Sequence, residues 1–391
     1  MRILYHHRTR AGDGQGVHIR ALQQALRELG HEVVEVSLVK NEPARVETPA
    51  KSWSAVDALP RFARELAEYS YTTFGRPKIV AAGVRQDCDV IYERYAFGNA
   101  AGIMAARKLR VPLILEVNSP MVLELSRTRG LSFPRLARSM ENWIFRSADR
   151  VCVVTEVLRE MLVELGVERS RLLVTPNGVH LRQFDYAAGA RERARVELGL
   201  DVADGDVVLG FVGFYREWHR LDLVLDELTR PGLARARLVL VGEGPAHADL
   251  AERARRLGVE PRVRFAGPRP HERIAELLPA FDVALVPAIN PYASPLKLFE
   301  YMAAGLPSIA PDQPNLREVL EHERNALLVK PNDAPSLEAA LAQLVQDRNL
   351  RERLGARARS DVIERDLTWI GNARRVVAAA EEVLAERRRK R

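Results

Sequence analysis

The sequence predicts an α/β protein with two Rossmann-like parallel-sheet domains facing a cleft. Short apolar runs alternate with helix-length amphipathic segments along the chain, a pattern typical of parallel sheets covered on both faces. The alternation starts afresh after a polar stretch at 183–206, which indicates a second domain. Ligands of such sheets bind beyond the carboxyl ends of the strands, so we expect a site lined by loops from both domains.

The elements expected in the first half are strands at 2–6, 33–38, 89–94, 112–118, 150–155 and 172–175, and helices at 16–29, 59–73, 98–109, 135–147 and 156–165. In the second half we expect strands at 207–213, 237–242, 263–266, 283–287, 308–310 and 326–329, and helices at 221–229, 246–257, 271–279, 295–304, 314–321, 335–346 and 349–364. The last helix, 370–387, has an apolar face that needs a partner, and we expect it to pack back on the first domain. The domains are therefore 1–183 with 370–387, and 184–369.

Composition bounds the class of protein. The chain has 391 residues, of which 47% are hydrophobic, and two cysteines, which fits a reducing cytoplasm. The first residues read as a strand rather than a signal peptide, and no apolar run is long enough to span a bilayer. The net charge is +7. The basic tail 386–391 and the aromatic, basic segment 61–80 suggest peripheral contact with an anionic membrane on its inner face, although a solvated surface is an equal alternative. Nothing indicates nucleic acid.

The most informative stretch is 294–307, which reads as loop, helix and stop. Ser294 is expected as the N-cap, Pro295 as the first helical residue, and Gly305 as the left-handed end. A helix start at a strand's carboxyl end binds anions, and Lys297 adds a cation where a phosphate would be held. Glu300, one turn further, could accept hydrogen bonds from sugar hydroxyls. The alternative is an ordinary crossover helix with solvated Lys297 and Glu300.

Four further loops could carry chemistry. The first is the glycine-rich 12–18, where Gly16 and His18 lie near a helix start but no third glycine completes a dinucleotide fingerprint. The second, 212–220, gathers Arg216, His219 and Arg220 after Gly213, and it either holds a diphosphate or is a solvated turn. The third contains Glu243 in Gly242-Glu243-Gly244-Pro245. The fourth places Glu116 and Asn118 on one face of a strand end.

Two Asp-X-Asp triplets, Asp87-Cys88-Asp89 and Asp204-Gly205-Asp206, look like metal-dependent nucleotide-sugar motifs. Both precede a strand, at the edge opposite the expected site, and they are interpreted as strand-entry turns. No zinc-ligand spacing, phosphate-binding Gly-Lys-Ser/Thr loop or Gly-X-Ser-X-Gly elbow occurs. We therefore expect no metal and no cofactor.

Taken together, the motifs resemble glycosyltransferase family 4, the retaining GT-B enzymes. The resemblance rests on the order and spacing of Gly30-His31-Glu32-Val33, Tyr92-Glu93-Arg94-Tyr95, Glu116-Val117-Asn118, Ala148-Asp149-Arg150-Val151, Pro176-Asn177-Gly178-Val179, Gly242-Glu243-Gly244-Pro245, Phe265-Ala266-Gly267 and Glu300-Tyr301-Met302-Ala303-Ala304-Gly305-Leu306-Pro307. It implies transfer of a sugar from a nucleotide-sugar, held by the second domain, to a glycan, lipid-linked or small-molecule acceptor, in polysaccharide or cell-envelope glycan synthesis.

The resemblance also assigns roles. Glu300 matches the family glutamate that binds the ribose, but the glutamate expected before it is Tyr292. The Arg and Lys expected in the second loop are Phe214 and His219, and the first-domain histidine is Asn118. The chain resembles a subset of the family that uses Ser294, Lys297, Arg216 and Arg220 instead.

The candidate residues follow from these motifs. The catalytic candidates are Lys297, Arg216, His219 and Asn118; the donor-binding candidates are Gly16, Gly213, Arg220, Glu243, Ser294, Pro295, Leu296 and Glu300; the acceptor-side candidates are His18, Glu93 and Glu116. The changed positions leave two alternatives open, a non-catalytic nucleotide-sugar-binding partner and a GT-B sugar-nucleotide epimerase. A nicotinamide dehydrogenase is disfavoured.

Overall fold

The computed structural model describes residues 1–9, 14–37 and 59–389, which form two compact units. The first unit consists of 1–176 and 369–391, and the second of 177–368. The division falls a few residues before the expected boundary at 183. Gly12, in the first glycine-rich loop, and the end of the basic tail lie outside the described residues.

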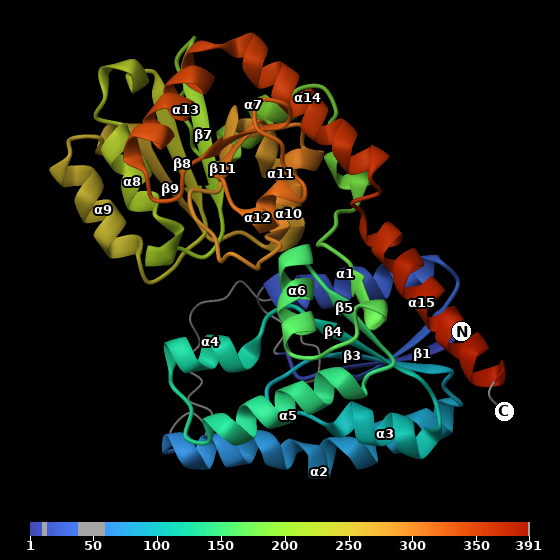
Figure 1. Cartoon of the computed structure of the whole chain (residues 1–391). Helices are drawn as coiled ribbons and strands as arrows, with labels where there is room; N and C mark the ends of the chain where they lie inside the picture. Colours follow the sequence, from blue (N-terminus) through green and yellow to red (C-terminus); the bar gives the residue numbers. More distant parts are fainter. Residues whose placement is uncertain (10–13, 38–58, 390–391) are drawn as a thin grey trace. The chain divides into compact units, whose positions relative to one another are not determined.

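The first unit contains a six-stranded parallel sheet in the order β2-β1-β3-β4-β5-β6 (Figure 1). Its strands are β1 (Arg2–His7), β2 (Glu32–Ser37), β3 (Val90–Arg94), β4 (Leu113–Val117), β5 (Arg150–Val153) and β6 (Leu172–Val174). Its helices are α1 (Gly14–Glu28), α2 (Arg61–Gln86), α3 (Ala101–Leu109), α4 (Met121–Thr128), α5 (Pro134–Ser147), α6 (Glu156–Glu164) and α15 (Trp369–Arg389). All residues of β3 and β4 are buried, including Glu93, Arg94 and Glu116, because both faces of these strands are covered.

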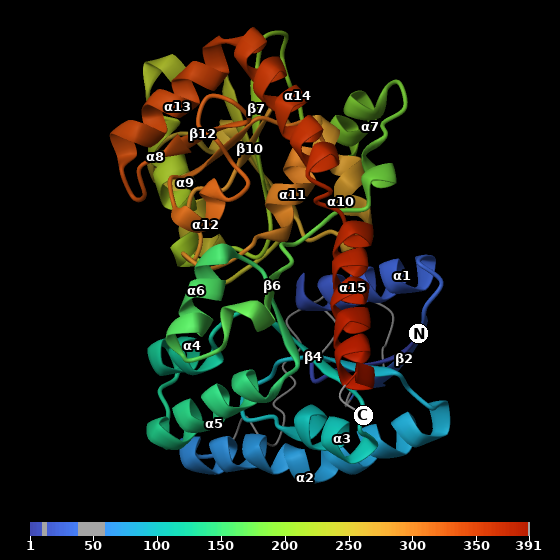
Figure 2. The same ribbon diagram turned by 45° about the vertical axis from the view of Figure 1, so that its right-hand side comes forward.

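The second unit repeats this plan with the order β12-β11-β10-β7-β8-β9 (Figure 2). Its strands are β7 (Val207–Val212), β8 (Ala236–Val241), β9 (Val263–Gly267), β10 (Val283–Leu285), β11 (Ser308–Pro311) and β12 (Ala326–Val329). Its helices are α7 (Ala190–Glu197), α8 (Leu221–Glu227), α9 (His247–Arg256), α10 (His271–Leu277), α11 (Leu296–Ala303), α12 (Pro314–Arg317), α13 (Ala334–Gln346) and α14 (Arg348–Glu364). Because β7 and β8 contribute to apolar clusters on both faces of the sheet, their carboxyl ends are held rigidly.

The last helix, α15, belongs to the first unit although it follows the second unit in sequence. Its start contacts α1, where the Trp369 and His18 rings lie 4.8 Å apart. Ion pairs near its end join Arg150 to Glu386 at 2.8 Å and Arg387 to Asp149 at 2.7 Å. Part of the basic tail is therefore paired with acids of the first unit. No helix within the described ranges has the length and apolarity to cross a bilayer.

Four helices differ from the expectations: α7 lies in the stretch 183–206 where no helix was expected, α12 ends at Arg317 rather than at 321, and α2 and α4 differ as follows. The helix expected at 59–73 continues to Gln86, through Gly75 and Pro77, because Ile79 and Ala82 bury a further apolar face. A Cβ at Gly75 would collide with the Tyr71 ring and press against Ala101 of α3, so glycine lets α2 pack closely there. Helix α4 was not expected at all; it has eight residues, Met121 to Thr128, of which Val122 is buried.

Candidate functional site

Helix α11 begins at the carboxyl end of β10, as the sequence predicts, but its cap differs from the prediction. Pro295, in extended conformation, is the N-cap residue, and no side chain caps the helix. Ser294 was expected as the cap and does not act as one. Its Oγ instead accepts a hydrogen bond from the backbone N–H of Asn177 at 3.0 Å, and its carbonyl accepts one from the Asn177 side chain.

The uncapped start leaves donors free. Among the described residues, no hydrogen bond satisfies the backbone N–H of Leu296 or of Lys297. Free N–H groups and the positive end of the helix dipole together favour an anion. Gly305 ends the helix region with φ of 71°, as expected for a left-handed terminus.

Tyr301 anchors α11 to the central strand. Its buried hydroxyl oxygen accepts a hydrogen bond from the N–H of Val212, the last residue of β7, at 2.8 Å. The loop after β7 therefore starts beside the first turn of α11. This contact brings the two motifs together, and nothing in the sequence pattern indicated it.

The loops after β7 and β8 approach each other closely through glycine. Gly213 and Gly242 have φ of 144° and 139°, in the range that favours glycine. A Cβ at Gly242 would collide with the Gly213 carbonyl oxygen, and one at Gly244 would collide with the Tyr215 backbone. The Tyr215 N–H donates to the Glu243 carbonyl at 2.8 Å. Small residues at these positions thus join two strand-end loops into one backbone surface.

Lys297 lies at the junction of this surface and α11. Its Nζ is 3.9 Å from the centroid of the Phe211 ring. A Cβ added to Gly213 would lie 2.7 Å from the same Nζ. In the part of the chain that the structure describes, no carboxylate pairs with this half-buried ammonium. Burial lowers the pKa of Lys297 from 10.5 to about 7, and Glu300 opposes the shift. A bound anion would reverse it.

The loop after β7 supplies one further open cation. Arg216 is exposed, stacks 5.0 Å above the Phe214 ring and has no carboxylate partner among the described residues. Arg220, in contrast, is bonded to Asp222 at 3.1 Å and to Asn332 at 2.8 Å. The sequence suggested three clustered cations in this loop; only Arg216 is unpaired.

His219 is not a cation in this structure. Burial, Lys297 and Arg216 together lower the pKa of the His219 ring to about 3. Its Nδ1 accepts a hydrogen bond from the Arg216 N–H at 3.3 Å. The neutral ring therefore shapes the turn, which corrects the expectation that it carries positive charge.

Two carboxylates border the same strand ends. Glu300 is buried, and its Oε1 lies 2.7 Å from His271 Nε2, while its Oε2 has no partner among the described residues. Glu243 lies 2.7 Å from His247 Nδ1. Each acid thus keeps acceptor capacity beside a histidine, as binding of vicinal hydroxyls requires. His271 was not among the predicted residues, because it comes from a strand end without a recognisable motif.

The two changed positions of the second unit have different surroundings. Tyr292, where the resemblance leads one to expect a glutamate, is buried. Phe214 is 51% exposed, below Arg216. Neither supplies charge, so Arg216 of the loop after β7 and Lys297 of α11 are the cations without a carboxylate partner in these two described segments.

In the first unit, the predicted residues His18, Glu116 and Asn118 form one buried cluster. Glu116 accepts hydrogen bonds from Tyr92 at 2.8 Å and from Arg94 and Asn118, and lies 3.2 Å from His18 Nε2. Burial alone would raise the pKa of Glu116, but His18 and Arg94 hold this pKa well below its usual range. Because an ionised carboxylate only accepts, Asn118 must turn its amide nitrogen inward and its oxygen outward.

The remaining predicted residues of the first unit lie apart from this cluster. Glu93 is buried and bonded to His6 Nδ1 at 2.6 Å and to Asn99 at 2.8 Å. Gly16 is buried in the first turn of α1. Both lie in the buried interior of the first unit.

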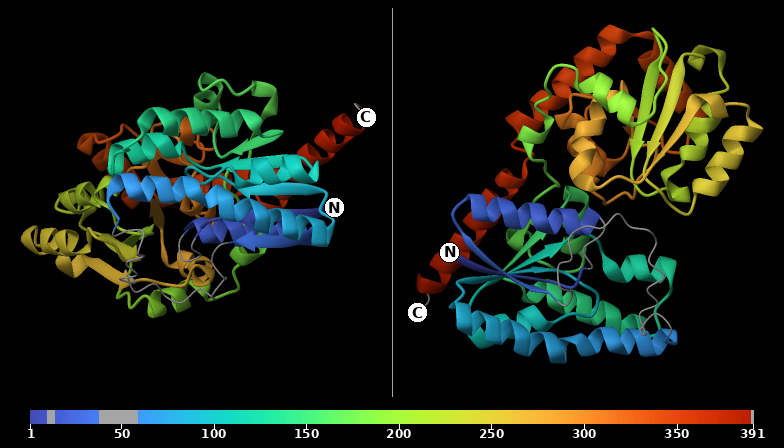
Figure 3. Two further views of the ribbon diagram at one scale, coloured as in Figure 1. Left: turned by 90° about the horizontal axis from the view of Figure 1, so that it is seen from below. Right: turned by 180° about the vertical axis from the view of Figure 1, so that it is seen from behind.

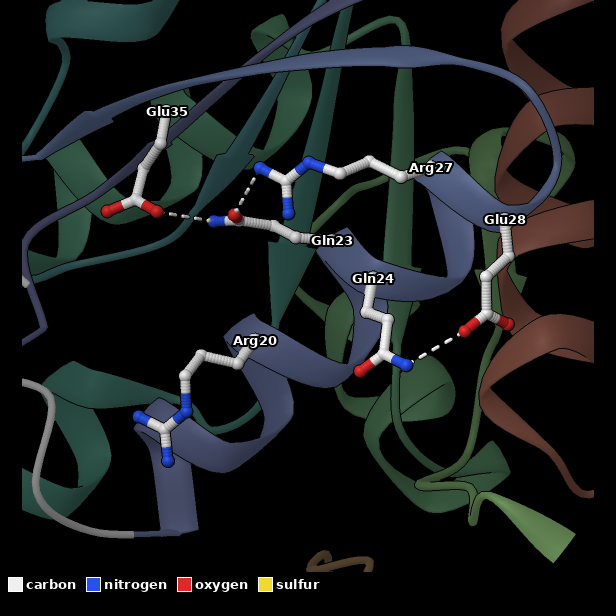
Figure 4. Close-up of a pocket in the computed structure, with 6 residues that line it drawn as sticks. All are labelled: Arg20, Gln23, Gln24, Arg27, Glu28 and Glu35. Atoms are coloured by element: carbon white, nitrogen blue, oxygen red, sulfur yellow. Dashed lines mark hydrogen bonds between the residues drawn. The ribbon is translucent and has the colours of Figure 1, made fainter. Parts of the chain in front are cut away.

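A hollow on α1 contains no predicted residue (Figure 4). Gln23 bridges Glu35 and Arg27 there, with distances of 3.1 and 3.2 Å, and Gln24 bonds Glu28 at 2.8 Å. These side chains satisfy one another, so the hollow offers few free groups to a ligand.

The two Asp-X-Asp triplets lie before β3 and β7, at the amino ends of strands. Asp89 accepts a hydrogen bond from the Arg2 N–H at 2.7 Å, and Asp206 accepts one from the Ala203 N–H at 3.1 Å. In the described ranges, no three His, Cys, Asp or Glu side chains group as metal ligands do.

Comparisons with known proteins identify the family of the chain. The family model "Glycosyltransferase Family 4" matches residues 12–183, and "Glycosyl transferases group 1" matches residues 206–347. A D-inositol 3-phosphate glycosyltransferase of Nocardia farcinica is 31% identical over 282 residues, 69% of this chain and 61% of that enzyme. An MMP alpha-(1->4)-mannosyltransferase of Mycolicibacterium hassiacum is 27% identical over 424 residues, and the match covers 98% of this chain and 98% of that enzyme.

A solved structure supports the fold. The Anabaena protein HepE, solved in complex with UDP, superposes with a TM-score of 0.72 at 17% identity, over 98% of this chain and all of that one. The chain has two parallel sheets, and its last helix belongs to the first unit. Each half of the chain matches a glycosyltransferase family model. The chain belongs to glycosyltransferase family 4 and has the GT-B fold.

Proposed function

We propose that the protein is a retaining, metal-independent glycosyltransferase that moves a sugar from a nucleotide-sugar to a glycan, lipid-linked or small-molecule acceptor. Family membership and the relatives, which are named as glycosyltransferases, support the transfer reaction. The HepE structure was solved in complex with UDP, which supports a nucleotide-sugar donor. Both cysteines are buried and free, which fits a cytoplasmic reaction. Polysaccharide or cell-envelope glycan synthesis is the proposed setting.

One observation carries the proposal: the half-buried ammonium of Lys297, without a carboxylate partner in the described chain, at an uncapped helix start. A buried cation without a counter-ion is costly, and a diphosphate would supply the missing charge. The free N–H groups of Leu296 and Lys297 would bind the same oxygens. Arg216 is the second cation, and Glu300 Oε2 is an acceptor for ribose hydroxyls.

The chemistry needs little else. The bond from the anomeric carbon to the β-phosphate oxygen breaks, a bond from that carbon to the acceptor oxygen forms on the same face, and the acceptor proton passes to the leaving phosphate. Negative charge grows on the phosphate as its bond breaks. A fixed cation and N–H groups stabilise that charge without reorganising. These protein donors are the reason for proposing that no metal is required.

The acceptor is proposed to meet the first unit near Asn118. The outward amide oxygen of Asn118 would accept a hydrogen bond from a sugar hydroxyl, with Glu116 and His18 behind it. Two alternatives keep the donor site and change the outcome. A non-catalytic partner would bind the nucleotide-sugar without turnover. An epimerase would need an acid or base at the sugar, and Glu116 is the one candidate. Because His18 and Arg94 lower its pKa and hold it ionised, Glu116 is no acid at neutral pH and only a weak base, which disfavours the epimerase.

The test is a thermal-shift screen of nucleotide-sugars, followed by product analysis with the donor that stabilises the protein. We expect an α-linked product from an α-linked donor by NMR, with undiminished rate in EDTA. An inverted product, or binding without turnover on any acceptor, would contradict the retaining enzyme. Loss of activity in EDTA with recovery in Mn²⁺ would contradict metal independence and return attention to Asp87 and Asp89.

A further inference from the structure

The outer side of α2 exposes large apolar side chains and no carboxylate. Its exposed positions recur every three or four residues along the helix, as one face of a helix does. Those without charge are Phe62, Leu66, Ser70, Thr73, Phe74, Pro77, Ala81 and Val84. Phe62 is 54% exposed, Phe74 65% and Val84 68%. Helices that face water usually carry acids as well as bases there, whereas the exposed charges of α2 are Arg61, Lys78 and Arg85 alone, so this face indicates a partner.

The charges around this face have one sign. The exposed charged residues of α2, α3 and α5, all fully described, are Arg61, Lys78, Arg85, Arg107, Lys108, Arg135, Arg138 and Arg146. The carboxylates of these helices turn inward: Glu65 and Glu141 are buried, and Glu68 is paired with Arg129 at 2.7 Å. Asp87, just beyond α2, is exposed but paired with Arg2 at 2.6 Å.

The three helices form a continuous surface, which we call the α2–α3–α5 face. Arg107 of α3 lies 5.3 Å from the Trp143 ring of α5 and bonds Ser147 at 3.3 Å. Figure 3, left, shows α2, α3 and α5 side by side when the unit is viewed from below. Met104, Leu136 and Trp143 extend the exposed apolar side chains of α2 across it. The surface therefore combines apolar anchors with cations over three helices.

Other helices of the same unit have the mixed surface expected in water. The exposed positions of α1 include Arg27 and Glu28, and those of α15 include Glu381 and Glu382. The absence of exposed acids is thus a property of the α2–α3–α5 face and does not follow from the net charge of the chain.

We propose that the α2–α3–α5 face docks on an anionic lipid bilayer. Aromatic and aliphatic side chains on one side of a helix insert at the boundary between headgroups and acyl chains, while flanking Lys and Arg are attracted to anionic headgroups. A second copy of this chain is a weaker candidate. A two-fold contact sets the same surface on both partners, and it would bring these cations against their own copies.

The docking is independent of the transfer reaction and can be tested without knowing the donor. Vesicles of phosphatidylcholine with phosphatidylglycerol, and vesicles of phosphatidylcholine alone, are mixed with the full chain and floated in a density gradient. We expect co-flotation with the anionic vesicles, weakened by high salt, and little with the neutral ones.

Two variants locate the contact. Phe62→Ser with Phe74→Ser should weaken partitioning by about tenfold or more, since each ring loses its burial in lipid. The matched control, Val196→Ser with Ile363→Ser, removes comparably exposed side chains of the second unit and should float like the wild type. Arg135→Glu with Arg138→Glu should likewise abolish preference for anionic vesicles. Circular dichroism checks that each variant is folded.

Three results would overturn the proposal: no co-flotation with anionic vesicles, equal flotation with neutral vesicles, or flotation that both α2 and α5 variants leave unchanged. Sedimentation of the protein alone tests the second copy. A dimer that Phe62→Ser with Phe74→Ser dissociates would assign the face to self-association and refute lipid docking.

Discussion

Raising the pH should switch off Lys297 and with it the efficiency of the enzyme toward its donor. The ammonium is half-buried between Phe211 and Gly213 and has no acidic partner in the described chain, so its pKa falls to about 7. Only the protonated form can meet the diphosphate charge. Since kcat/KM reports groups of the free enzyme, it should fall as the pH rises above this value.

The size of the effect follows from the same value. With a pKa of about 7, roughly one tenth of the enzyme is protonated at pH about 8 and roughly one hundredth at about 9. Donor kcat/KM should therefore drop about tenfold per pH unit. The decline should level off about 10²–10³-fold below the plateau, where the remaining donors act without the cation. The pH dependence of kcat should lie at higher pH, because the bound diphosphate raises the pKa of Lys297.

The assay is steady-state kinetics at varied donor concentration across this range. A nucleotide-sugar suits it, because its diphosphate is a diester with no proton to lose there. Lys297→Met should give a low rate without this limb, and Lys330→Met, at an exposed lysine of the same unit, should keep the wild-type profile. A flat profile in the wild type, or the same limb in Lys297→Met, would refute the assignment.

Three further variants test other parts of the site. Glu300→Gln should weaken nucleotide binding by about 1.5–3 kcal/mol with little change in melting temperature, because a charged acceptor becomes neutral; unchanged affinity in calorimetry would remove Glu300 from the site. Gly242→Ala should lower the free energy of unfolding by at least about 1–3 kcal/mol, since a Cβ meets the Gly213 carbonyl at a left-handed φ; urea unfolding measures this, and wild-type stability would contradict the close approach. Glu116→Gln should lower the free energy of unfolding by about 3–5 kcal/mol, because Arg94 is left buried without its partner; a smaller decrease in urea unfolding would show that the ion pair is dispensable.

Much of the fold follows from the sequence because its signals are local. Alternating apolar runs and helix periods predicted all twelve strands of the two parallel sheets, and the glycine at 305 predicted the end of α11. The errors also have local causes. Gly75 and Pro77 suggested a helix end, whereas burial of Ile79 and Ala82 continues α2 beyond them.

The site was harder to predict because its contacts join distant segments. Ser294 looks like an N-cap by residue type, yet Asn177, over a hundred positions earlier, takes its hydroxyl. His219 looks like a cation until burial and the neighbouring Lys297 are known. The hydrogen bond from Val212 to Tyr301 leaves no pattern in the sequence, although it sets β7 against α11.

The central claim is that Lys297 stabilises the charge that develops on the leaving diphosphate. Its most direct test is the kinetics of Lys297→Ala with the donor found in the screen, beside Lys330→Ala as the control. Because the cation acts most strongly as the glycosidic bond breaks, kcat should fall about 10²–10³-fold while the donor KM changes much less. Turnover near the wild-type value in Lys297→Ala would show that Lys297 does not stabilise the leaving diphosphate and would contradict the account.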